Sequence, residues 1–304
     1  MMNIDIKDID FASFRDPSGF IFTHEKEIYR VISPIYAENF SFFIKSGLYK
    51  SLSDQKLIVG HTETEKLLLK EYSSYKIIKP EKIPFISYPY EWCFGQLKSA
   101  ALLTLSVMQE SLKHDMILKD ASAYNVQFIG SKPIFIDTLS FEKYEENTPW
   151  VAYRQFCQHF LAPLALMHYK DSSLSKLLQI YIDGIPLALT SSLLPKKTMF
   201  NSGIALHIHF HAKIQSAYQK KKITGGKNHF YLSKKKLLAM LEHLKETINN
   251  LKSLKDNSIW KNYRSENLYG QSSAEEKSNA GKNSRAISQL IFSFSSYCLI
   301  KPVS

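Results

Sequence analysis

Hydrophobic and polar positions in the first 80 residues follow the pattern of short β-strands. Two aromatic and β-branched runs flank a polar turn at residues 24–26, which predicts a β-hairpin. Ser33 and Pro34 then form a helix-start signal, and apolar residues recur at helical spacing as far as Gly47. Two later apolar runs are further strand candidates: residues 56–60 and 75–80. The start of the chain therefore predicts a small mixed sheet with one helix.

The pattern changes after residue 82. Residues 83–92, IPFISYPYEW, contain two prolines and four aromatic residues, which favours an extended connector over a helix. From Phe94 to Lys113 apolar residues recur at three- and four-residue steps, which predicts a long helix. Two short apolar strands around a tight turn at residues 130–133 come next. The rest of the chain reads mainly as helix.

These elements predict an α+β protein in which a small sheet lobe precedes a larger helical lobe that carries a short β-hairpin. We expect five segments in chain order: a mixed-sheet lobe at 1–82, a hinge-like connector at 83–92, a helical lobe at 93–200, a Lys-rich helical extension at 201–260 and a tail at 261–304.

Composition places the chain among soluble globular proteins. Its 304 residues are 44% hydrophobic and 22% charged, and no run approaches the roughly 20 apolar residues of a membrane helix. The first residues include acids and lack the basic and apolar regions of a secretory signal. The three cysteines lie far apart without a CxxC motif, which favours reduced thiols. We therefore expect a cytoplasmic protein without a membrane span.

The formal net charge of +11 is concentrated in one segment. Residues 212–255 contain eleven lysines, no arginine and two glutamates, a net charge of +9. Lysine supplies point charge without the bidentate geometry of arginine, so the pattern favours a solvated helical face. An anionic partner such as RNA, lipid headgroups or a polyanionic substrate is the alternative.

The candidate chemistry lies in the loop and hairpin after the long helix. Asp120 and Asn125 form D-x-x-x-x-N, and Asp137 ends an apolar strand twelve residues later. A hairpin between Asn125 and Asp137 would bring an amide and a carboxylate together as hard oxygen ligands for Mg²⁺. Asp120 is then the candidate base or orienting group. The alternative is local: Asp and Asn side chains cap turns in many proteins.

A histidine cluster stands at residues 207, 209 and 211. On a helix, His207 and His211 would share a face and be able to bind a metal ion. Their alternation with Leu, Ile and Phe fits amphipathic packing instead, and we expect packing.

The loop-and-hairpin layout resembles the catalytic core of protein kinases and aminoglycoside phosphotransferases. The resemblance implies a kinase-like two-lobe fold that binds Mg²⁺ with ATP or another nucleotide. It gives Asp120 the place of the catalytic aspartate, and Asn125 and Asp137 the places of the two metal ligands. Four more residues match nucleotide-contacting positions or could stack a base or sugar: Arg30, with Glu38 as its partner, and Tyr88 and Tyr90 in the hinge-like connector.

The sequence also departs from that pattern. Residues 16–19, DPSG, supply one glycine where a glycine-rich loop is expected. Leu118 stands where the kinases have histidine, and Asp137 is followed by Thr-Leu where they have Phe-Gly. These differences bear on catalysis more than on the fold.

Longer blocks resemble the N-terminal region of bacterial proteins described as class I SAM-dependent methyltransferases, including nodulation-type methyltransferase-like proteins. The blocks include FRDPSGFIF, ISYPYEW, LKDASAYNVQF and PIFIDTLSFE, and the resemblance covers roughly residues 14–270. In that group a SAM-binding domain with a D-x-G-x-x-x-G loop follows, and this sequence contains no such loop. A truncated gene, a split chain and a single-module relative are the alternatives, and we do not expect this chain to bind SAM.

Two function hypotheses follow from these residues. The first is a kinase-like module of a methyltransferase-type protein, which binds nucleotide with Mg²⁺, or substrate, through Asp120, Asn125 and Asp137. The second is a non-catalytic module that recognises a substrate or partner for a methyltransferase domain on another chain. Binding of an anionic polymer at residues 212–255 is compatible with either hypothesis.

Overall fold

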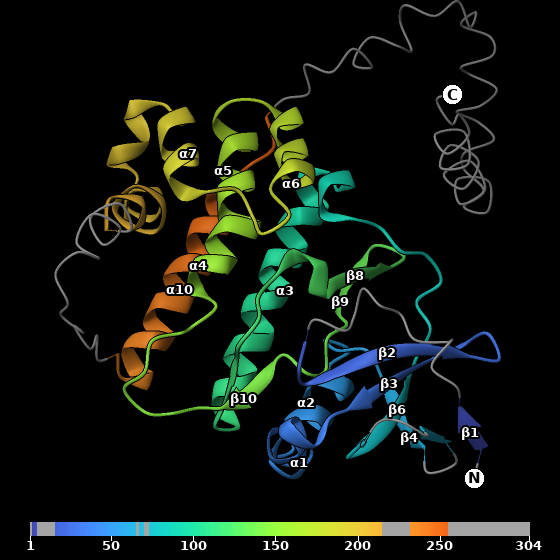
Figure 1. Cartoon of the computed structure of the whole chain (residues 1–304). Helices are drawn as coiled ribbons and strands as arrows, with labels where there is room; N and C mark the ends of the chain where they lie inside the picture. Colours follow the sequence, from blue (N-terminus) through green and yellow to red (C-terminus); the bar gives the residue numbers. More distant parts are fainter. Residues whose placement is uncertain (1, 5–15, 65–66, 70–72, 215–231, 255–304) are drawn as a thin grey trace, which may run out of the picture. The chain divides into compact units, whose positions relative to one another are not determined.

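The computed structural model describes residues 2–4, 16–64, 67–69, 73–214 and 232–254. The described residues belong to one compact unit, which ends at Leu254. The predicted tail at 261–304 lies outside the described residues, as do residues 215–231 and 255–260 of the Lys-rich extension. The mixture of helices and strands confirms the α+β class (Figure 1).

An antiparallel four-stranded sheet forms the N-terminal part, in the order β2–β3–β6–β4. The predicted hairpin is present as β2 (Gly19–His24) and β3 (Glu27–Ile32). Its two turn residues, Glu25 and Lys26, have φ angles of 51° and 67°, as a two-residue hairpin turn of the I′ kind requires. The remaining strands of the sheet are β6 (Lys76–Pro80) and β4 (His61–Thr64), and a parallel pair is formed by β1 (Met2–Ile4) and β5 (Leu67–Leu69).

The strand predicted at residues 56–60 forms part of a different pairing. Val59 N–H donates to Phe135 O at 2.8 Å, and Phe135 N–H donates to Leu57 O at 2.9 Å. This short segment therefore runs beside the later hairpin strand and not within the N-terminal sheet. The predicted helix is also present, as the turn η3 (Pro34–Tyr36) and α1 (Ala37–Lys45), and α2 (Leu48–Asp54) follows it.

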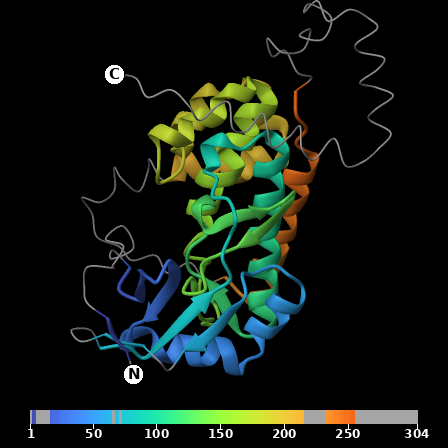
Figure 2. The ribbon, with the colours of Figure 1, turned by 90° about the vertical axis from the view of Figure 1, so that its right-hand side faces the viewer.

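The connector at 83–92 is extended apart from the short turn η4 (Pro89–Glu91), as expected from its prolines. It is anchored on the later hairpin, because Ser87 N–H donates to Gln127 Oε1 and Gln127 Nε2 donates to Ser87 O, both at 3.0 Å. Trp92 Nε1 donates to Ser87 Oγ at 2.9 Å. The connector can be followed from β6 to the next helix in Figure 2.

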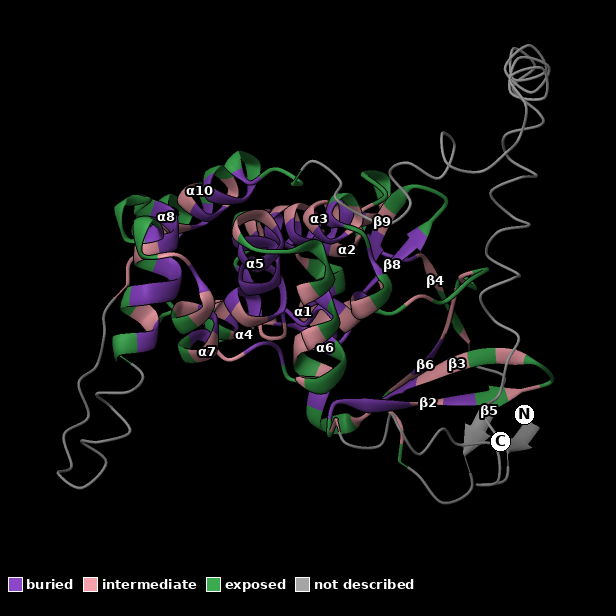
Figure 3. Ribbon diagram, turned by 90° about the horizontal axis from the view of Figure 1, so that it is seen from above, coloured by how far each residue is buried: buried purple, intermediate pink, exposed green. Residues whose placement is uncertain are grey.

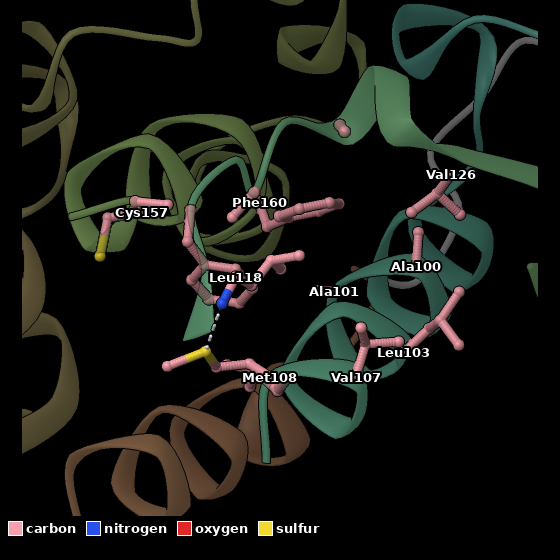
Figure 4. Close-up of a cluster of buried hydrophobic side chains, with 14 of the residues drawn as sticks. Ala100, Ala101, Leu103, Val107, Met108, Leu118, Val126, Cys157 and Phe160 are labelled. Carbon is pink, nitrogen blue, oxygen red and sulfur yellow. Dashed lines mark hydrogen bonds between the residues drawn. The ribbon is translucent and has the colours of Figure 1, made fainter. Parts of the chain in front are cut away.

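Helix α3 (Phe94–Lys113) forms the centre of the core, as its spacing of apolar residues predicts. Its buried face packs against α5 (Ala162–Tyr169), α10 (Lys234–Asn250) and the strand β9 (Lys132–Phe135). Buried positions concentrate on the inner faces of α3 and α5 (Figure 3). Figure 4 shows part of this core, in which Leu118 N–H points to Met108 Sδ at 3.4 Å.

Two short strand pairs hold the candidate loop. The strand β7 (Met116–Leu118) enters the loop and pairs with β10 (Phe141–Lys143), which follows it. Between them lie η5 (Ala123–Asn125) and the predicted hairpin of β8 (Val126–Ile129) and β9. The β7–β10 pair thus returns the chain to where the loop began.

The remaining described residues are mainly helical. A π-helical stretch, η6 (Cys157–Leu161), joins α4 (Tyr153–Phe156) to α5 just before Pro163, where a kink is predicted. The later elements are η7 (Ser172–Lys176), α6 (Leu177–Ile180), α7 (Leu187–Leu193), η8 (Lys196–Phe200), α8 (Ser202–Ile204), the π-helix η9 (Ala205–Phe210) and α10. Across the described ranges, no helix has the length and apolar character that a membrane crossing requires.

Candidate functional site

The candidate site is a polar cluster built from the loop after β7, the end of the β8–β9 hairpin and strand β3 of the sheet. The backbone brings the two halves of the motif together, because Ile136 N–H donates to Asn125 O at 2.8 Å. Lys119 N–H donates to Ser140 O at 2.8 Å and closes the loop from the other side. The predicted approach of Asn125 to Asp137 is therefore present.

Asp120 shapes the loop through a local hydrogen bond. Its Oδ1 accepts from Ser122 N–H at 2.9 Å, and Ser122 Oγ in turn accepts from Tyr124 N–H at 3.2 Å. Ala121 N–H donates to Gln155 Oε1 of α4 at 2.8 Å. The turn-capping role that was the alternative for Asp120 is thus real, and the half-buried carboxylate remains the candidate base.

Asp137 is the carboxylate of the cluster with the most hydrogen-bond and ion-pair partners. Arg30 Nη1 donates to its Oδ1 at 2.5 Å, and Leu139 N–H donates to the same oxygen at 3.1 Å. Ser140 Oγ donates to its Oδ2. Burial by itself raises the pKa of Asp137, but the Arg30 guanidinium and these hydrogen bonds outweigh it and hold the pKa below its usual range. Asp137 is therefore a stable anion in the folded protein.

Ser140 links the two predicted metal ligands. Besides donating to Asp137, its hydroxyl accepts a long hydrogen bond from Asn125 Nδ2 at 3.4 Å. The amide oxygen of Asn125 is not used in this hydrogen bond. Sequence reasoning missed Ser140, because it stands three residues after Asp137 in an ordinary Thr-Leu-Ser run.

The DPSG turn lies against the loop. Lys119 Nζ donates to Ser18 Oγ at 2.9 Å and stands over the Tyr36 ring, 4.8 Å from its centroid. The Tyr36 hydroxyl donates to Phe141 O. Burial raises the pKa of Tyr36 strongly, and the nearby Asp137 carboxylate raises it further. The single glycine of the turn, Gly19, has no room for a side chain, because a Cβ there would lie 2.0 Å from Val31 O.

The expected partnership of Arg30 with Glu38 is wrong. Arg30 pairs with Asp137, whereas Glu38 pairs with Lys143 on β10 and keeps 80% of its side chain exposed. The reason is the start of α1: Glu38 lies in its first turn and faces solvent, while Arg30 faces the loop from β3. Of these two residues, only Arg30 belongs to the cluster.

Tyr88 and Tyr90 stack on each other in the connector, with ring centroids 5.5 Å apart and an interplanar angle of 4°. Tyr88 is 45% exposed. Burial raises the pKa of Tyr124 in the loop, and the charges of Tyr90 and Tyr88 raise it further. The contact of Tyr88 and Tyr90 with a ligand stays a prediction.

The histidine cluster takes part in the packing of side chains, as expected. His207 contacts Tyr153 OH at 2.6 Å through Nδ1 and His243 Nδ1 at 2.9 Å through Nε2, and His209 contacts Ser191 and Thr198 hydroxyls. Among the residues that the structure describes, no group of three or more His, Cys, Asp or Glu side chains is arranged to hold a metal ion.

Mg²⁺ is commonly held in proteins by one or two carboxylates together with substrate phosphates. Asp137 and Asn125 offer a carboxylate and an amide oxygen of that hard type. Arg30 offers a charged hydrogen-bond donor for phosphate oxygens. Its Nε–H is buried and finds no acceptor among the described residues. By donor chemistry, the cluster fits a metal ion only in combination with an anion.

The described residues define an α+β protein in which a buried Arg–Asp ion pair joins an antiparallel sheet to a loop-and-hairpin unit. No known protein-family profile matches the chain. The chain is similar to the nodulation protein NoeA of Rhizobium meliloti (strain 1021), with 34% identity over 271 residues, which are 88% of this chain and 56% of the relative. It thus spans about half the length of the curated relative that it matches.

This similarity supports a nodulation-protein family for the chain, in agreement with the nodulation-type resemblance of the sequence.

Proposed function

We propose that this chain is a kinase-like module that binds a nucleotide with Mg²⁺ through the cluster of Arg30, Asn125 and Asp137. The observation that carries the proposal is the buried contact of Arg30 with Asp137, in which the arginine Nε–H has no acceptor among the described residues. An arginine with a spare donor beside a carboxylate and an amide oxygen is the chemistry that recognises a metal-bound phosphate.

The order of elements supports the same proposal. A long helix, the strand β7, a loop carrying Asp120 and Asn125, a hairpin and then Asp137 follow one another, and β10 returns to pair with β7. Bound Mg²⁺ would neutralise phosphate charge, and Asp137 and Asn125 would hold it. Asp120, on the same loop, would accept or orient a proton of the acceptor.

The test is thermal unfolding with and without ATP and Mg²⁺. A ligand present at about 100 times its Kd adds about 2.7 kcal/mol to stability, which should raise the Tm by about 4 °C in a chain of this size. Asn125→Ala should abolish the shift, because it removes the amide oxygen while leaving the Arg30–Asp137 pair intact. Glu38→Gln, an exposed change outside the cluster, should leave the shift unchanged. No shift in the wild type would refute the proposal.

A second candidate function is a non-catalytic recognition module for a methyltransferase domain on another chain. Both oxygens of Asp137 already accept hydrogen bonds within the protein, so the cluster is also able to act as a purely structural clasp. The curated relative is named a nodulation protein, and we propose that this chain serves a process of that kind. Co-purification of a methyltransferase chain with a protein that shows no nucleotide-dependent shift would favour this candidate.

An anionic partner at residues 212–255 stays a proposal as well. In the described part, α10 buries Leu237, Leu241 and Leu244 against the core, while Lys235 and Lys236 are exposed. These lysines are accessible to an anionic surface, and the leucines are not.

A further inference from the structure

Both carboxylate oxygens of Asp137 are engaged within the protein. Its Oδ1 accepts from Arg30 Nη1 and Leu139 N–H, and its Oδ2 accepts from Ser140 Oγ. The side chains of Arg30 and Asp137 are only 15% and 16% exposed, so water screens the pair weakly. A divalent cation approaching Asp137 would meet an engaged carboxylate and a guanidinium of the same sign of charge.

The hydrogen-bond donors of Arg30 are only partly satisfied in its contact with Asp137. Its guanidinium carries five N–H donors, and the buried Nε–H finds no acceptor in the part of the chain that the structure describes. Burying an unmet donor on a charged group is unfavourable, so an anion with several oxygens would be bound in preference to the present single carboxylate oxygen. Arg30 is thus held by Asp137 without being saturated by it.

We propose that Arg30 is a built-in counter-cation of Asp137, and that the site admits a divalent cation only together with a phosphate-bearing anion that takes over Arg30. This inference rests on the proposed function and specifies the ligand: a metal–polyphosphate pair, with neither component bound tightly alone. Each protein charge keeps a partner of opposite sign in this exchange. Asp137 gives up its contact with Arg30 and binds the metal, and Arg30 gives up its contact with Asp137 and binds phosphate.

The physical reason for the coupling is the penalty for an uncompensated charge in a partly buried place. A cation that arrives alone would leave the guanidinium without its carboxylate, and an anion that arrives alone would leave the carboxylate without its guanidinium. When both arrive, each protein charge keeps a partner of opposite sign. By linkage, the anion must raise the affinity for the cation by the same factor as the cation raises the affinity for the anion.

Equilibrium dialysis tests this with Mn²⁺ as the probe cation and ATP as the probe anion, with bound Mn²⁺ and bound ATP counted separately at matched free concentrations. For the wild type, we expect Mn²⁺ to bind at least ~100-fold more tightly with ATP than alone, which corresponds to the upper part of the usual range of coupling between sites. Mn²⁺ binding that is equally tight with and without ATP would overturn the inference.

The variant Arg30→Met removes the counter-cation and frees Asp137. We expect Mn²⁺ alone to bind at least ~10-fold more tightly than to the wild type, and the enhancement by ATP to be lost. Lys79→Met, which removes a cation from the neighbouring strand β6 of the same sheet, is the matched control and should keep wild-type coupling. Unchanged Mn²⁺ affinity in folded Arg30→Met would contradict the proposal.

Arg30→Met leaves Asp137 without its partner and risks misfolding, so the double variant Arg30→Met, Asp137→Asn provides a neutral pair of similar size. The double variant should fold. It should bind Mn²⁺ weakly with or without ATP, because the metal ligand is gone. Tight Mn²⁺ binding by the double variant would place the metal elsewhere and refute the exchange. Failure of the proposed function looks different: the wild type would then bind neither Mn²⁺ nor ATP in any combination.

Discussion

At the scale of single residues, Asp120 has an observed structural role and a proposed chemical one. Its Oδ1 accepts from Ser122 N–H and shapes the loop, which any acceptor of the same shape would do. The negative charge is required only for the proposed role of Asp120 as a base. The two roles are therefore separable by substitution.

Asp120→Asn should keep the loop, because the asparagine amide oxygen still accepts from Ser122 N–H. Asp120→Ala should lower the free energy of unfolding by about 1 kcal/mol, the usual contribution of such a hydrogen bond. Both variants should reduce nucleotide turnover by ~100-fold or more if Asp120 is the base. Urea unfolding and phosphate release measure the two effects. Unchanged turnover in Asp120→Asn would remove Asp120 from the chemistry.

At the scale of elements, the DPSG turn contacts the loop after β7. This contact holds the N-terminal sheet against the candidate site. Lys119 reaches Ser18, and Gly19 packs its backbone against both Val31 O and the Leu139 side chain. Leu139 N–H is itself a donor to Asp137. A change at Gly19 therefore acts on the site as well as on the sheet.

Gly19→Ala should destabilise the protein by about 1–3 kcal/mol, because the new Cβ would lie 2.0 Å from the Val31 carbonyl oxygen and the backbone must shift. Gly95→Ala is the matched control: its Cβ meets nothing nearer than Cys93 Sγ at 4.0 Å, and it lies in α3. That variant should be neutral or slightly stabilising. Chemical unfolding of both would measure the difference, and equal stabilities would contradict the tight contact at Gly19.

At the scale of the whole molecule, buried neutral histidines couple stability to pH. Burial lowers the pKa of His61 and His159 from 6.5 to about 4. Burial, followed by His243 and His211, lowers the pKa of His207 to about 3. Each histidine therefore binds a proton more tightly in the unfolded chain than in the folded protein.

Acid should therefore destabilise the protein. Above pH 6.5 these histidines are neutral in both states, whereas below it the unfolded chain gains protons that the folded protein cannot. The free energy of unfolding should thus fall by several kcal/mol between about pH 6.5 and pH 4, and mostly level off as the folded pKa values are passed. Urea unfolding at about pH 7, 5.5 and 4.5 tests this. His159→Phe, which cannot titrate, should show a shallower decline, and an equally steep one would exclude His159 as a contributor.

Local patterns in the sequence determined the elements that form the candidate site. The β2–β3 hairpin, the helix α3, the β8–β9 hairpin and the approach of Asn125 to Asp137 all depend on neighbours within about 20 residues, so spacing and turn residues suffice to predict them. The pairing of residues 57–59 with Phe135 was not predictable in this way, because its partner lies far along the chain.

Only the tertiary structure decided which charges meet. Arg30 contacts Asp137 across a long stretch of chain, while Glu38, which is close to Arg30 in sequence, turns to Lys143. The Ser140 bridge and the Lys119–Ser18 contact could not be read from the sequence either. Short-range periodicity determines which face of an element is buried, but the partner of a buried charge is set by the packing of elements distant in sequence. That packing gives Asp137 an arginine, and with it the proposed requirement for a metal and an anion together.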